Sequence, residues 1–193
     1  MIKKDNVLNF LIFFLILSFS CVESKSKREF NYADSLGRVE FVDKDIYEKS
    51  VNNLPICCVD VFIYNPIDKS YFLVLRKNAP AKGVWWYPGG RLFKGEKFFD
   101  CAIRKCREEA NLDIIPITQL NKTFSTNFPD SEWGSSTFTV NLVVFAKLKS
   151  FEKAVLNKDH VDFKWVNIET PPKDPYCYQI YKDVLKILKK PLR

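Results

Sequence analysis

A glycine-rich segment that leads into a charged helix constrains the fold of this chain more than any other feature. Gly89 and Gly90 open the segment, and the adjacent carboxylates Glu108 and Glu109 follow it. Between them, apolar residues recur at the spacing of one helical face. These residues are Phe99, Ala102, Ile103, Cys106 and Ala110. We therefore predict a loop that passes into a helix, with the apolar face of the helix packed on a sheet.

The carboxylates of this segment suit a hard divalent cation. Oxygen ligands bind Mg²⁺ or Mn²⁺, and such an ion can bridge to phosphate oxygens. Arg104 lies one helical turn before Glu108, within reach of an ion pair. On the charges alone we would prefer a solvated helix face, because most runs of charge are solvated. The glycine loop that precedes the helix reverses that preference and favours a site for a metal ion and a phosphate.

Apolar and β-branched runs on both sides of the segment predict the remaining elements. Strands are expected at 55–64, 71–76, 84–87, 112–126, 136–149 and 161–166. A short helix or arm is expected at 40–50 and a last helix at 176–190. The order β, β, short β, α, β, β, β, α predicts an α/β fold in which a mixed sheet is sandwiched between helices.

Charge and cysteine content exclude two classes of protein. The 193-residue chain carries a formal charge of +7, but its basic residues are scattered and cluster only at 25–28 and 186–193. We therefore expect no nucleic-acid partner. The six cysteines show no spacing typical of a zinc site. We expect small buried thiols rather than a disulfide framework.

The N-terminus requires a separate interpretation. Residues 1–20 combine a basic start with an apolar run too short to span a bilayer comfortably, which predicts a secretory signal. The run ends at Cys21 in a sequence that resembles a relaxed bacterial lipobox, so Cys21 is a candidate for lipidation. Residues 21–48 then form a polar tether and arm, and 49–193 form the domain. We expect an exported protein that touches a membrane only through a lipid anchor. The alternative is a cytoplasmic protein whose true start lies downstream.

The central segment resembles the Nudix family, whose box reads Gx5Ex7REUxEExGU. The matching positions are Gly90, Glu96, Arg104, Glu108, Glu109 and Leu112. Two positions depart from the box, because Lys105 replaces a glutamate and Asn111 replaces a glycine. The resemblance implies the Nudix fold, and the lysine weakens any claim to the usual cluster of three carboxylates.

A wider pattern over roughly residues 50–170 resembles Nudix enzymes of the GDP-mannose mannosyl hydrolase type. The pattern includes Leu75-Arg76, the run from Asn78 to Arg91, and the run from Lys158 to Trp165. In that group, water attacks the anomeric carbon of the sugar with inversion, and the nucleoside diphosphate leaves as a magnesium complex. The resemblance therefore implies a nucleotide-sugar substrate, such as GDP-mannose. We also expect a homodimer.

The same resemblance implies a set of metal ligands. Gly90 would bind Mg²⁺, or Mn²⁺, through its backbone carbonyl, and Glu109 would bind it through its carboxylate. Asp159 stands where the group has a glutamine ligand. Glu108 would either bind the ion directly or hold it through water. These four residues are the metal site that the sequence predicts.

The resemblance also assigns roles in binding and catalysis. Arg76 and Arg91 would hold the diphosphate, and Asp60 would contact the sugar. Arg104 would stabilise the leaving group if it turns toward the site. His160, the single histidine of the chain, falls on the general base, and its ordinary pKa near 6.5 suits proton abstraction at neutral pH.

Aromatic residues near the box have two interpretations. Trp85 and Trp86 fit one core position and one position at the edge of a base-stacking pocket. Trp133, in the loop before the strand expected at 136–149, is a candidate to cover the substrate.

Two other functions remain open at this level. One is a conventional Nudix pyrophosphohydrolase, in which Glu108 or Glu109 helps water attack phosphorus in a nucleoside diphosphate derivative. The other is a nucleotide-binding protein that keeps the fold and has lost the chemistry at Lys105.

Overall fold

The computed structural model describes residues 42–134, 136–150 and 153–189. The predicted signal segment, Cys21 and most of the predicted tether lie outside these residues, so those assignments stay predictions. Within the described residues, no helix combines the length and apolar character needed to cross a membrane. The five cysteines of this part of the chain are all free thiols.

One seven-stranded mixed sheet forms the centre of the domain. Its strands are β1 (Ile56–Asn65), β2 (Ser70–Arg76), β3 (Trp85–Trp86), β4 (Gly89–Arg91), β5 (Ile114–Phe128), β6 (Thr137–Leu148) and β7 (His160–Asn167). The main path runs β3-β2-β1-β6-β5, while β4 pairs with β1 and β7 pairs with β2. Strands β1 and β6 are parallel, and the other pairs are antiparallel. The mixed sheet predicted from the order of elements is confirmed.

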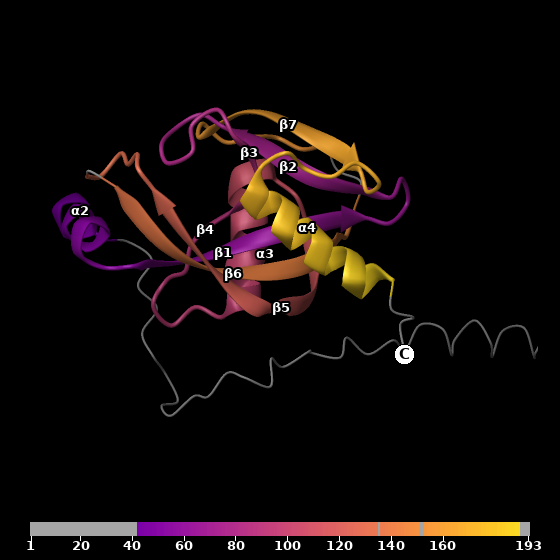
Figure 1. The fold of residues 1–193 in the computed structure, drawn as a ribbon, viewed down its shortest axis with the longest axis horizontal. Helices are drawn as coiled ribbons and strands as arrows, with labels where there is room; N and C mark the ends of the chain where they lie inside the picture. The colour runs from indigo at the N-terminus through magenta and orange to yellow at the C-terminus, as the bar shows by residue number, and fades with distance from the viewer. Residues whose placement is uncertain (1–41, 135, 151–152, 190–193) are drawn as a thin grey trace, which may run out of the picture. The chain divides into compact units, whose positions relative to one another are not determined.

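Two helices cover opposite faces of this sheet. Helix α3 (Phe98–Ala110) and helix α4 (Pro175–Leu188) lie on either side of β1 and β6, with α4 nearer the viewer (Figure 1). Successive side chains of a strand point to opposite faces. Accordingly, Val59 and Val61 of β1 belong to the core cluster around α3, whereas Phe62 belongs to the cluster around α4. The predicted sandwich is confirmed.

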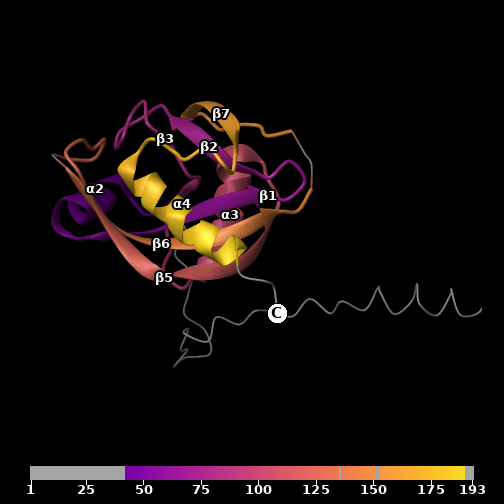
Figure 2. The same cartoon turned by 45° about the vertical axis from the view of Figure 1, so that its right-hand side comes forward.

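Helix α2 (Lys44–Asn53) precedes the sheet and lies beside one end of the β5 and β6 strands in both views (Figures 1 and 2). Asp43 caps its first turn by accepting a hydrogen bond from the amide of Asp45 at 2.9 Å. The helix begins inside the predicted arm and continues past the predicted boundary at residue 48. Helix α2 therefore spans the boundary that was predicted between the arm, 21–48, and the domain, 49–193.

The structure adds one strand that the sequence did not predict. Gly89–Arg91, expected as loop, is strand β4 and pairs antiparallel with residues 58–60 of β1. Two glycines in three residues give no β-propensity, and the pairing depends on a neighbouring strand rather than on local sequence. The helix after it ends as expected, because Asn111 adopts a left-handed conformation with φ of 52°.

A buried carboxylate connects three elements beside β4. Asp60 of β1 is only 3% exposed. Its Oδ2 accepts a hydrogen bond from Asn141 of β6 at 2.7 Å and a short one from the hydroxyl of Tyr176 at the start of α4. Burial raises the pKa of Asp60 to about 6, although both hydrogen bonds oppose the rise. The folded protein therefore holds the proton of Asp60 more tightly than the unfolded chain does.

This raised pKa predicts a distinct pH dependence of stability. Protonated Asp60 favours the folded state below its ordinary pKa, and the benefit is lost as the pH rises through about 6. Between about pH 5 and pH 7.5, the free energy of unfolding should fall by about 1 to 1.5 kcal/mol more in the wild type than in Asp60→Asn. Urea titrations in the presence of a chelator would measure both slopes. Equal slopes in the two proteins would contradict a raised pKa at Asp60.

Candidate active site

A cavity of about 630 Å³ opens where four elements meet. The end of β2, strand β4, helix α3 and the start of β7 each contribute a side chain or backbone to it. Five of the sequence-predicted site residues line it: Arg76, Gly90, Glu109, Asp159 and His160. These residues come from distant parts of the chain, and the fold brings them together at one cavity.

His160 is held in one orientation at the wall of this cavity. Its side chain is 4% exposed, and its Nδ1 lies 3.0 Å from the amide oxygen of Asn157. That oxygen also accepts from the backbone amide of Asp159 at 3.0 Å, which fixes the Asn157 side chain. Because an amide oxygen only accepts, the hydrogen bond assigns the proton to Nδ1 and leaves a lone pair on Nε2. Burial lowers the pKa of His160, so the ring is neutral at physiological pH.

Glu109 lies opposite the histidine and joins α3 to β4. One oxygen accepts a hydrogen bond from the amide of Gly89 at 3.1 Å and lies 3.7 Å from Nε2 of His160. The other oxygen lies 2.8 Å from the ammonium of Lys105. The loop before His160 is hydrogen-bonded to the same helix, because the backbone amide of Asn157 donates to the backbone carbonyl of Glu109 at 3.1 Å. These contacts fix the spacing between the carboxylate and the imidazole.

The predicted metal ligands divide into two groups. Gly90, Glu109 and Asp159 line the His160 cavity and offer one carbonyl and two carboxylates, which is the kind of donor set that Mg²⁺ prefers. Among the described residues, no three Asp, Glu, His or Cys side chains are gathered closely enough to hold an ion by themselves. The set therefore fits an ion that also takes oxygen ligands from a bound phosphate.

The structure separates Glu108 from the other three predicted metal ligands. Adjacent residues of a helix point about 100° apart, and the side chain of Glu108 is 45% exposed on another face. It accepts hydrogen bonds from Arg104 at 3.1 Å and from Lys105 at 3.2 Å. Burial by itself would lower the pKa of Lys105, but Glu109 and Glu108 outweigh that effect and raise it. Lys105 therefore stays an ammonium between the two carboxylates.

The guanidinium of Arg104 connects α3 to Glu96 and to the end of β4. Its Nε and Nη2 donate to the buried carboxylate of Glu96 at 2.7 and 2.8 Å, and Nη2 also donates to the carbonyl of Arg91 at 3.0 Å. These bonds hold the segment after β4 against α3. The predicted turn of Arg104 toward the His160 cavity is not seen, because its donors are engaged with these partners.

The predicted substrate-binding residues occupy three different places. Arg76 lines the His160 cavity and donates from Nε to the carbonyl of Pro80 at 2.6 Å. Arg91 lines a second cavity, next to α2. Asp60 is buried beside Gly89 and lines neither cavity. A sugar contact by Asp60 stays a prediction, and it would need the glycine strand to move.

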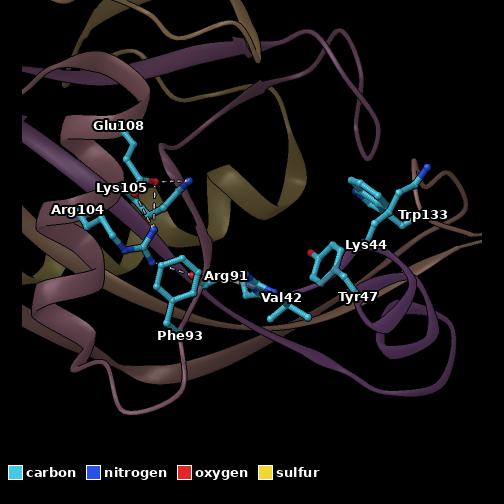
Figure 3. Close-up of a pocket in the computed structure, with 9 residues that line it drawn as sticks. All are labelled: Val42, Lys44, Tyr47, Arg91, Phe93, Arg104, Lys105, Glu108 and Trp133. Atoms are coloured by element: carbon cyan, nitrogen blue, oxygen red, sulfur yellow. Dashed lines mark hydrogen bonds and ion pairs between the residues drawn. The ribbon is translucent and has the colours of Figure 1, made fainter. Parts of the chain in front are cut away.

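The second cavity, of about 400 Å³, lies between α2 and the charged face of α3. Figure 3 shows α3 residues on one side, the α2 residues and Trp133 on the other, and Arg91 between them. Its lining includes Lys44, Tyr47, Arg91, Phe93, Lys105 and Trp133. Trp133 also lines the His160 cavity, so the two cavities are neighbours.

Sequence reasoning missed several residues that shape these cavities. Asn157 orients His160, but asparagine is common in loops and nothing in its local sequence marks a role. Tyr47 was part of an arm with no assigned chemistry.

Trp85 and Trp86 line neither cavity. Trp86 is stacked on Tyr176 with centroids 4.6 Å apart, and the ammonium of Lys164 lies 3.9 Å above Trp85.

Comparison with known proteins identifies relatives of limited identity. Low-salt glycan biosynthesis protein Agl8 of Haloferax volcanii is 36% identical over 91 residues, which are 47% of this chain and 56% of that protein. ADPR responsive transcriptional repressor NtrR of Acinetobacter baylyi is 26% identical over 128 residues, 64% of this chain and 49% of the repressor. The chain thus spans about half the length of the curated relatives it matches.

Solved structures share the fold at low identity. A Caenorhabditis elegans Ap4A hydrolase in a binary complex matches with a TM-score of 0.56 and 18% identity, over 69% of this chain and 97% of that one. The MutT protein of Methanosarcina mazei matches with a TM-score of 0.56 and 21% identity, over 70% and 97%. A model of the NUDIX domain matches residues 57–185, which include both the glycine segment and His160. The chain belongs to the Nudix family.

Proposed function

We propose that this protein is a nucleotide-sugar hydrolase that cleaves the bond between the sugar and the diphosphate. The observation that carries the proposal is the position of His160, which Asn157 orients and whose Nε2 lies 3.7 Å from Glu109 in a cavity that Arg76 also lines. Nudix hydrolases act on nucleotide-derived substrates. The name of the Haloferax relative, a glycan biosynthesis protein, supports a sugar-containing substrate here.

The geometry supports general-base catalysis by the histidine. A water molecule in the cavity would give a proton to Nε2 of His160 as its oxygen bonds to the anomeric carbon. The bond from that carbon to the diphosphate oxygen breaks, and the oxygen keeps the electron pair. Asn157 stabilises the charged imidazole by accepting from Nδ1, and Glu109 lies close enough to stabilise the new positive charge. Arg76 would stabilise the diphosphate as it leaves.

Nudix hydrolases generally use divalent metals such as Mg²⁺, and we propose Mg²⁺ for this chain. Gly90, Glu109 and Asp159 would hold the ion, with the diphosphate completing its oxygen ligands. The ion would neutralise negative charge on the leaving group. Lys105 neutralises one oxygen of Glu109 at 2.8 Å. The chain therefore offers fewer free carboxylate oxygens than a box with glutamate at that position.

The bond that breaks can be identified by isotope labelling. Hydrolysis of GDP-mannose in H₂¹⁸O with Mg²⁺ should yield free mannose carrying ¹⁸O and unlabelled GDP, because water attacks carbon. Mass spectrometry of both products would measure the label. A nucleoside monophosphate product with ¹⁸O in a phosphate would identify a pyrophosphohydrolase instead. Other nucleotide sugars, tested in parallel, would identify the preferred sugar and base.

Removal of the proposed general base, His160, should lower the rate of the chemical step. His160→Ala should decrease kcat by about 10² to 10⁴, the usual contribution of a general base, with a much smaller change in KM. Steady-state kinetics with the preferred nucleotide sugar would measure both constants.

A surface variant provides the control for this measurement. Lys153→Ala changes an exposed residue outside both cavities and should leave kcat near the wild-type value. Near wild-type kcat in a correctly folded His160→Ala protein would exclude His160 as the base and favour attack on phosphorus.

A further inference from the structure

The cavity between α2 and α3 has a chemical character of its own. Four cationic side chains line it against the single carboxylate of Glu108, together with three aromatic rings. The cations are Lys44, Arg91, Arg104 and Lys105, and the rings belong to Tyr47, Phe93 and Trp133. A surface that combines cations and aromatic faces suits a ligand that is both anionic and planar. Its volume of about 400 Å³ lies within the range of small-molecule sites.

The rings and cations of this cavity are arranged in contact with each other. The guanidinium carbon of Arg91 lies 4.7 Å from the ring centroid of Tyr47 and 5.1 Å from that of Phe93. Tyr47 meets Trp133 edge to face, with centroids 5.5 Å apart. Each ring is thus fixed by a neighbour before a ligand arrives, so binding a flat group would cost little side-chain entropy.

Helix α2 also holds the loop that carries Trp133. The side-chain amide of Asn52 donates to the carbonyl of Trp133 at 3.1 Å. Gly134 approaches Asn52 so closely that a Cβ atom at this glycine would collide with it. Trp133 therefore lies at the boundary between the two cavities because α2 places it there. Helix α2 itself lies outside residues 57–185, the part matched by the family model.

Lys105 provides the second link between the cavities. Its ammonium lies 3.2 Å from Glu108, which lines the α2 cavity, and 2.8 Å from Glu109, which lines the His160 cavity. Its side chain also packs against Gly90, where an added Cβ would lie 2.8 Å from Cε of the lysine. A positive charge therefore lies where an elongated ligand would pass from one cavity to the other.

We propose that the α2 cavity binds the nucleoside half of the substrate. The nucleobase stacks on Tyr47, the diphosphate lies near Lys105 and Arg91, and the sugar reaches His160. This inference rests on the proposed nucleotide-sugar substrate and adds a role for α2 in binding its nucleoside. Since stacking accepts any base, Tyr47 supplies affinity for nucleosides as a class.

Binding to the full chain by calorimetry would test the inference. The probes are GDP, UDP and inorganic diphosphate, each with Mg²⁺. Loss of one stacking ring in Tyr47→Ala should weaken both nucleotides by about 5- to 100-fold and leave inorganic diphosphate unchanged. Tyr47→Phe keeps the ring and should bind both nucleotides within about twofold of the wild type. Tyr178→Ala removes an exposed tyrosine of α4 that lines neither cavity and should also bind normally.

The outcomes separate this inference from the proposed function. Equal nucleotide affinity in the wild type and Tyr47→Ala would overturn it even if His160 proves essential for hydrolysis. An equal loss of affinity for inorganic diphosphate in Tyr47→Ala would also overturn it, since the effect would then not concern the nucleobase. Tyr47-dependent nucleotide binding without release of sugar would support the cavity assignment and contradict the proposed reaction. Trp133→Leu gives the same comparison if Tyr47→Ala fails to fold.

Discussion

The close approach of Gly89 and Gly90 to their neighbours is the constraint on which the rest of the site depends. These residues pair with Asp60 and Val59 of β1. A Cβ added at Gly89 would lie 2.5 Å from the backbone carbonyl oxygen of Val59, and Gly90 has a φ of 155°, which residues with side chains rarely adopt. Only glycine allows the strand to lie between β1 and α3. Because the strand lies there, the amide of Gly89 reaches Glu109, and Glu109 reaches His160.

Charge compensation explains how so many ionised groups lie together at this end of α3. Glu96 is buried and accepts from Arg104, while Glu109 is buried and pairs with Lys105. A buried carboxylate without such a partner would become protonated or destabilise the fold. Lysine at position 105 thus gives Glu109 a cationic partner within the same helix, 2.8 Å away. The departure from the family box changes the electrostatics of the site and leaves the fold intact.

Sequence periodicity predicted the elements whose formation depends on their own residues. The apolar face from Phe99 to Ala110 defines α3, and Asn111 ends it as a left-handed cap. Strand β4 was missed because its pairing depends on β1. The grouping of His160 with Glu109 came from the family resemblance and not from spacing in the chain. Asn157 and Tyr47 could not be assigned, because their roles depend on neighbours that only the folded chain brings together.

The two cavities share the box segment and differ in the elements that complete them, and this difference bears on how ligands are selected. The His160 cavity is built from the box, β2 and β7, so changes there alter the chemistry. The α2 cavity takes Lys44 and Tyr47 from a helix outside the family-matched residues. If the α2 cavity binds the nucleoside as proposed, a substitution on α2 changes that affinity while the contacts between His160, Asn157 and Glu109 stay the same. Trp133 lines both cavities and is held by Asn52 of α2, so the loop that carries Trp133 is one route by which such a change would reach the His160 cavity.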